Sequence, residues 1–174
     1  FILPFLVFCS ACISFCSCKS EDKKASYTIL VINSFSKEYP WMQKIENGIT
    51  DAFDDNNMDV SVSSYILDTK FTSLSTQKNN LNNLLDSLSG NPPDLIITTY
   101  DEAIYSLLDT EHELTHSTPI VFTGVRYLNY ELIGKHNHKN VTGTTNHPDF
   151  VKCYRLAQQL LGKIDEIQII GEES

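Results

Sequence analysis

The sequence lacks three features that would each point to a common class of protein. Cys153 is the only cysteine after residue 18, which excludes a disulfide framework for most of the chain. The net charge is −9 and no run of Lys and Arg is dense enough to follow a phosphate backbone, so nucleic acid is a poor candidate partner. Neither a GxGxxG nor a GxxxxGK[ST] pattern occurs, which argues against the common phosphate-binding loops.

The first 18 residues contain no charged side chain, end in small residues and precede a polar stretch. This pattern is typical of a secretory signal and is too short for a full membrane span. We therefore predict a signal peptide at 1–18, a polar tether at 19–26 and an extracytoplasmic, membrane-associated location. Ser17-Cys18 resembles the end of a lipoprotein signal, although Phe15 and Cys16 depart from the usual pattern, so lipidation of Cys18 remains an alternative.

Short apolar strands alternate with amphipathic helices about every 35 residues, which predicts a doubly wound, parallel α/β sheet. The expected strands are 28–32, 60–67, 94–99, 119–123 and 141–145, and together they make a first lobe at 27–147. A further helix with Phe150 to Leu161 and a sixth strand at Glu166–Ile170 are expected to open a second lobe at 148–174. A buried strand with nothing to cover it suggests that the sequence is truncated at Ser174.

In an open parallel sheet, ligands bind beyond the carboxyl ends of the strands. The loops there should be 33–40, 68–72, 98–102, 123–127 and 145–148, and they carry hydrogen-bonding and aromatic side chains suited to a small polar molecule. Trp41 fits either a helix-start anchor or a ligand-stacking ring. Asp101 and Glu102 are expected either to cap a helix or to bind a ligand amine. Arg126 is expected either to bind a ligand carboxylate or to be an ordinary surface residue.

His112-Glu113-Leu114-Thr115-His116 matches the HExxH pattern of zinc peptidases. Ser117 and Pro119 break the helix at once, and the segment precedes a strand, which places it at the end of the sheet opposite the ligand loops. A zinc hydrolase is therefore only a remote alternative. The scattered His136, His138 and His147 suggest no metal site, and no Ser/His/Asp or Cys/His grouping supports catalysis. We expect no cofactor and no metal.

Four segments, ILVINSFSKEYPW, PDLIITTYDEA, TPIVFTGV and NVTGTT, occur in an order and spacing that resemble the ABC-transporter substrate-binding-protein-like family. The resemblance runs from about Thr28 to Ile170, and the same pattern occurs in the extracytoplasmic sensor region of bacterial hybrid two-component histidine kinases. It implies a type I periplasmic-binding-protein fold, of which this chain holds the first lobe and the start of the second. It also implies a small polar molecule in the cleft between two lobes. By position, the implied ligand contacts are Ser34, Phe35, Trp41, Tyr100, Asp101, Thr123 and Gly124.

Two roles follow from this resemblance. As a sensor domain, the protein would continue through a transmembrane helix into its own kinase module, and any enzymatic activity would reside there. As the binding protein of an ABC importer, it would serve a transporter permease and could be anchored by a lipid on Cys18. The sequences of the NSFSKEYPW and PDLIITTYDEA segments are closer to those of the sensor branch. The sensor is therefore our prediction, and the importer is its alternative.

Overall fold

A computed structural model describes residues 26–135 and 139–168 of the 174-residue chain. The predicted signal peptide at 1–18, its Cys18, nearly all of the tether at 19–26 and both His136 and His138 lie outside the described residues, so those predictions stay predictions. None of the helices in the described ranges is long and apolar enough to span a bilayer.

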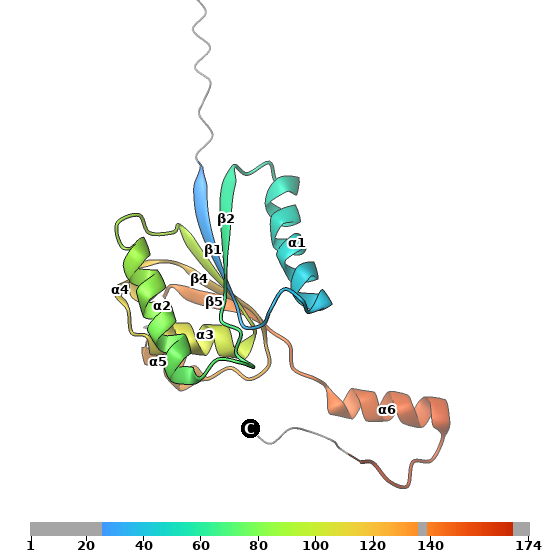
Figure 1. The fold of residues 1–174 in the computed structure, drawn as a ribbon. Helices are drawn as coiled ribbons and strands as arrows, with labels where there is room; N and C mark the ends of the chain where they lie inside the picture. The colour runs from blue at the N-terminus through green and yellow to red at the C-terminus, as the bar shows by residue number, and fades with distance from the viewer. Residues whose placement is uncertain (1–25, 136–138, 169–174) are drawn as a thin grey trace, which may run out of the picture.

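Five parallel strands form one sheet in the order β2-β1-β3-β4-β5 (Figure 1). The strands are β1 (Tyr27–Asn33), β2 (Val60–Ile66), β3 (Leu95–Thr99), β4 (Ile120–Val125) and β5 (Val141–Thr145). Each of the first five expected strands is confirmed within about two residues of its predicted ends, as usual for boundaries read from sequence. The chain is therefore a doubly wound, parallel α/β domain.

Helices cover both faces of this sheet. Helix α1 (Pro40–Asp55) packs on one face, and α2 (Leu74–Leu88), α3 (Tyr100–Asp109), α4 (Glu113–Ser117) and α5 (Tyr130–Lys135) pack on the other. The alternation along β1 explains the two layers, because successive side chains of a strand point to opposite faces. Leu30 and Ile32 join the larger core with α2 and α3, whereas Ile29 and Val31 contact α1 through its Ile49 and Phe53.

Local sequence signals account for where the helices begin. Pro40 occupies the first turn of α1, where backbone N–H groups make no hydrogen bond within the helix, so the N–H that proline lacks is not needed. The Ser73 hydroxyl caps α2 by accepting a hydrogen bond from the Thr76 amide. Leu81 and Leu85 of α2 are fully buried, and each such side chain contributes about 1.5–3 kcal/mol to folding.

The C-terminal part of the described chain differs from the sequence expectation. Helix α6 (Phe150–Leu161) forms as predicted, but none of its residues is buried and it projects away from the sheet (Figure 1). Residues 163–168 have no regular secondary structure, so the predicted strand Glu166–Ile170 is wrong over its described part; residues 169–170 lie outside the described ranges. A strand requires a neighbour for its backbone hydrogen bonds, and no described strand pairs with this segment.

Candidate functional site

The sheet has a topological switch point between β1 and β3. From β1 the chain crosses to β2 on one side, whereas from β3 it proceeds to β4 on the other. The loops that leave these two adjacent strands therefore diverge, and the space between them is where open α/β sheets bind ligands. Both strands end in buried polar residues, Asn33 and Thr99, rather than in the aliphatic residues that fill their middles.

Hydrogen bonds between these strand ends fix the floor of the switch point. The Ser34 hydroxyl donates to the Thr99 carbonyl (2.6 Å) and accepts from the Ala103 amide (2.9 Å), so it caps α3 from a different part of the chain. The Thr99 hydroxyl donates to Asn33 Oδ1 (3.1 Å). The amide group of Asn33 in turn donates to Glu46 of α1 (2.7 Å). Ser34 is 0% exposed, and its hydroxyl is committed to joining β1, β3 and α3.

Tyr100 follows β3 in a left-handed backbone conformation, with φ of +66°. For a bulky residue this conformation costs on the order of 1–3 kcal/mol and persists only when the surroundings hold it. Its ring lies 5.3 Å from the Phe35 ring, centroid to centroid, and packs against the backbone of Gly124, where a Cβ would lie 3.5 Å from it. Burial raises the pKa of Tyr100, and the nearby Arg126 partly opposes that rise. Strain of this kind is found preferentially at functional sites.

The loop after β4 is held by two side chains of α3 that lie one helical turn apart. The Asp101 carboxylate accepts hydrogen bonds from the backbone amides of Arg126 (3.0 Å) and Tyr127 (3.1 Å), and it lies 3.6 Å from the Arg126 guanidinium. The Tyr105 hydroxyl donates to the Tyr127 carbonyl and accepts from the Asn129 amide (3.0 Å). Asp101 thus binds a neighbouring loop and does not cap its own helix.

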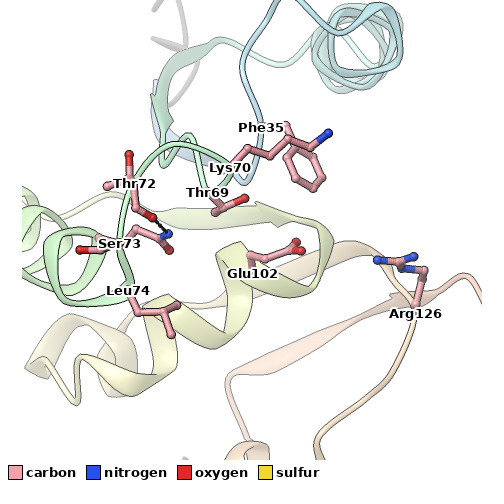
Figure 2. Close-up of a pocket in the computed structure, with 9 residues that line it drawn as sticks. Phe35, Thr69, Lys70, Thr72, Ser73, Leu74, Glu102 and Arg126 are labelled. Atoms are coloured by element: carbon pink, nitrogen blue, oxygen red, sulfur yellow. Dashed lines mark hydrogen bonds between the residues drawn. The ribbon is translucent and has the colours of Figure 1, made fainter. Parts of the chain in front are cut away.

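A pocket of about 630 Å³ opens at this edge of the sheet (Figure 2). Its volume lies within the range of small-molecule sites. Segments from four parts of the chain contribute its lining, which consists of Phe35, Thr69, Lys70, Thr72, Ser73, Leu74, Gln77, Glu102 and Arg126. Gln77 is almost fully buried and donates to the Thr72 carbonyl (2.6 Å), which fixes the loop after β2 against α2. Phe35 and Glu102 face the pocket from opposite sides (Figure 2).

A chain of aromatic rings extends from the pocket to the start of α1. Phe35 contacts Tyr39 edge to face at 6.1 Å, and Tyr39 lies tilted over Trp41 at 4.6 Å. The Lys70 ammonium is 4.9 Å from the centre of the Tyr39 ring and 5.8 Å from that of Phe35, within reach of a cation–π contact. Trp41 is 42% exposed, so the outer end of this chain faces solvent.

The structure brings most of the residues expected from the family resemblance to one edge of the sheet. Phe35 lines the pocket, Tyr100 and Gly124 pack behind it, and Trp41 lies farther out, where its ring contacts Tyr39. Thr123 lies elsewhere: its hydroxyl contacts Thr144, and its side chain lines a separate apolar groove between α1 and the sheet. The role of these positions in ligand binding stays a prediction.

Sequence reasoning overlooked Lys70, whereas it named Glu102 as either a helix cap or the partner of a ligand amine. The loop at 68–72 was among those expected to border the crevice, but no side chain in it stood out by type or motif. What distinguishes Lys70 is its position over two aromatic rings that come from another loop. Only the tertiary structure supplies that information.

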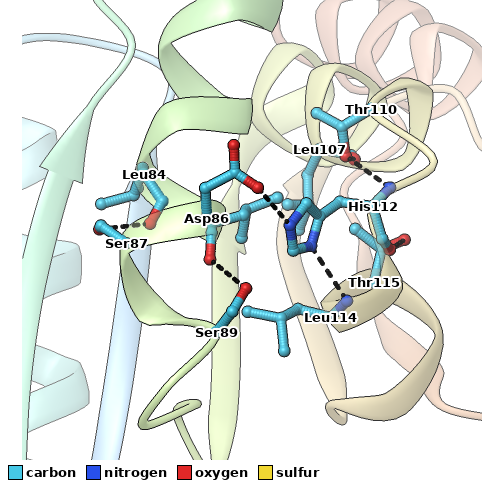
Figure 3. A network of polar contacts seen from close by, with 10 residues as sticks. Leu84, Asp86, Ser87, Ser89, Leu107, Thr110, His112, Leu114 and Thr115 are labelled. Atoms are coloured by element: carbon cyan, nitrogen blue, oxygen red, sulfur yellow. Dashed lines mark hydrogen bonds and ion pairs between the residues drawn. The ribbon is translucent and has the colours of Figure 1, made fainter.

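The HExxH segment is not arranged as a zinc site. His112 precedes the five-residue helix α4 and caps it, because its Nδ1 accepts a hydrogen bond from the Leu114 amide (3.1 Å; Figure 3). Its Nε2 lies 3.2 Å from Asp86 of α2, so both ring nitrogens are engaged. The segment lies before β4, at the opposite end of the sheet from the pocket. Across the described ranges, no three His, Cys, Asp or Glu side chains are grouped closely enough to hold a metal ion.

Comparison with known proteins identifies the fold. No family model and no curated protein matches the sequence. The solved structures that it resembles include an ABC domain from Streptococcus pneumonia in complex with L-Trp (19% identity, TM-score 0.54), a conserved domain protein from Vibrio cholerae (15%, 0.60), and a substrate-binding protein with adhesive properties from Clostridium difficile in its ligand-free, open form (13%, 0.55). The matches cover 77%, 79% and 76% of this chain but 43%, 44% and 43% of those proteins.

These likenesses show that the chain has a periplasmic-binding-protein-like fold. The chain spans less than half the length of the proteins it resembles. Identities below 20% carry no information about which ligand is bound.

Proposed function

We propose that this chain is the first ligand-binding lobe of an exported protein that captures a small molecule, and that it serves as the extracytoplasmic sensor domain of a two-component histidine kinase. The observation that carries the binding function is the pocket at the β1/β3 switch point, with its aromatic and charged lining. The fold of the structural neighbours supports it. In this proposal a second lobe closes on the same edge of the sheet, and closure shifts a signalling equilibrium.

The exposed helix α6 supports the proposed second lobe. Its apolar residues Phe150, Leu160 and Leu161 are 66–78% exposed, although the helix is amphipathic. An amphipathic helix buries its apolar face in a folded protein, so this face requires a partner. We assign that partner to the second lobe of the same protein, which residues 148–174 would begin.

The binding protein of an ABC importer is the second candidate, favoured by the descriptions of two structural neighbours as an ABC domain and a substrate-binding protein. The preference for the sensor rests on the sequence resemblance. The reading frame beyond Ser174 separates the two: a membrane helix and a kinase core would support the sensor, and a stop after one further lobe would support the importer. Lipidated Cys18 in the mature protein would also count against the sensor.

Ligand binding is tested with the full-length protein and a panel of amino acids, amines, sugars, nucleosides and organic acids that includes L-Trp. A compound present at about 100 times its dissociation constant should stabilise the folded protein by about 2.7 kcal/mol, which thermal unfolding detects. Phe35→Ala should abolish that stabilisation because Phe35 lines the pocket. Tyr27→Ala is the matched control, since Tyr27 lies at the opposite end of β1. If no compound in the panel stabilises the protein, the binding function is rejected.

A further inference from the structure

The pocket contains a carboxylate whose charge no described residue balances. Among the described residues, only two buried side-chain oxygens have no hydrogen-bond partner, Thr98 Oγ1 and Glu102 Oε2, and only that of Glu102 belongs to an acid. Glu102 lies in the first turn of α3, and its carboxylate points into the space between Phe35 and Arg126 (Figure 2). Burying a carboxylate oxygen without a partner is unfavourable, so native proteins rarely keep one without a use for it.

The neighbouring carboxylate is in the opposite situation. Asp101 accepts hydrogen bonds from the amides of Arg126 and Tyr127 and lies beside the Arg126 guanidinium. Its oxygens are therefore committed to holding the loop after β4. Of the two acidic residues that the sequence places at this helix start, only Glu102 remains able to meet a ligand.

The two cations that line the pocket have other partners. Lys70 lies over the rings of Tyr39 and Phe35, and Arg126 lies 3.6 Å from Asp101. Neither forms an ion pair with Glu102 within the described part of the chain. Within the described residues, no cation therefore neutralises the Glu102 carboxylate.

We infer that Glu102 binds a protonated nitrogen of the ligand, so that the protein selects compounds that carry an amine. This inference rests on the proposed binding function and narrows its ligand class. The ammonium N–H groups would donate to the Glu102 carboxylate, while the adjoining hydrocarbon or ring packs on Phe35. Ser34, Asp101 and Tyr105 act only by positioning the loops around this contact.

Two matched pairs of probes test the inference in the full-length protein: tryptamine with tryptophol, and tyramine with tyrosol. Within each pair an ammonium replaces a hydroxyl and the ring is unchanged. The wild-type protein should bind each amine more tightly than its alcohol. Glu102→Gln should weaken amine binding by about tenfold to one-hundredfold, the range expected for a charge-assisted hydrogen bond, and leave alcohol binding unchanged. Asp109→Asn is the control, since Asp109 lies on the same helix but is exposed and paired with Lys78.

A second measurement needs no ligand. If the buried, unpartnered Oε2 of Glu102 is kept for binding, Glu102→Gln should raise the melting temperature of the unliganded protein by about 2–4 °C. A lower melting temperature would assign Glu102 a structural role and overturn the inference. The inference would also be overturned if compounds without an amine bound as tightly as their matched amines, or if Glu102→Gln weakened amines and alcohols equally. In both cases the binding function itself would stand. A panel with no bound compound at all would reject both.

Discussion

Ser34 provides the sharpest test of how the site is built, because its hydroxyl makes two hydrogen bonds in a region closed to water. Ser34→Ala leaves the Thr99 carbonyl and the Ala103 amide without this partner. Each lost bond costs about 0.5–1.5 kcal/mol, and a buried polar group left unpaired can cost about 1–3 kcal/mol. We therefore expect the free energy of unfolding to fall by about 2–4 kcal/mol, since the two effects overlap.

Equilibrium unfolding in urea measures that loss, and Ser87→Ala is the matched control. The Ser87 hydroxyl also bonds a carbonyl, that of Leu84, but on the exposed face of α2, so its removal should change stability by less than about 0.5 kcal/mol. Amide hydrogen exchange localises the effect, because the Ala103 amide should exchange faster in Ser34→Ala than in the wild type.

The family resemblance placed Ser34 among the ligand contacts, and the same variant separates that role from a structural one. If the hydroxyl serves the ligand, Ser34→Ala should lower affinity with little change in stability. A stability loss below about 1 kcal/mol together with a protected Ala103 amide would refute the structural role of the Ser34 hydroxyl.

Three other predictions concern the stability of the fold. Gly143→Ala should lower the free energy of unfolding by more than about 2 kcal/mol, because a Cβ there would overlap the Phe122 carbonyl. Gly48→Ala is the control: its Cβ meets open space on a helix, so it should stabilise the protein by about 0.5–1 kcal/mol. Similar effects of the two substitutions in equilibrium unfolding would contradict the predicted overlap. Stability should fall as pH rises through the pKa of Tyr100, because burial raises that pKa in the folded protein and the unfolded chain loses the proton first. Tyr100→Phe should make the loss of stability with rising pH less steep in alkaline unfolding titrations. An unchanged slope would be evidence against this role of Tyr100. His112→Ala should cost about 1 kcal/mol through loss of the α4 cap, with no zinc measured in either protein; zinc bound by the wild type alone would restore the metal-site alternative.

Periodicity predicted the strands and helices because each element's own residues encode it. The continuous apolar run at 28–32 and the leucine stripe of 74–88 depend only on neighbours in sequence. The sixth strand failed because a strand also needs a partner, and partners are not visible in a local window. The apolar residues of the segment led to the prediction of a strand, but residues 166–168, its described part, form none.

For the candidate site, the sequence predicted the loops but not the individual side chains. The strand-end rule selects the right loops, since it follows from topology alone. The strand-end rule cannot predict which polar side chains in those loops contact a ligand. A side chain can do so only if other groups of the protein do not already bind it. Asp101 and Glu102 are adjacent and chemically alike, yet loop amides 25 residues further on occupy one and leave the other.

Consecutive residues in the first turn of α3 therefore have different roles. Tyr100 holds a strained backbone and wedges its ring between Phe35 and Gly124, and Asp101 holds the loop after β4. Both contacts position the walls of the pocket, and both leave those side chains committed before any ligand arrives. Glu102 is the residue of this turn whose carboxylate is still unpaired, so a ligand that neutralises it completes an arrangement which the rest of the turn has already built. Preorganised walls around one uncompensated charge are a basis for selecting one class of ligand.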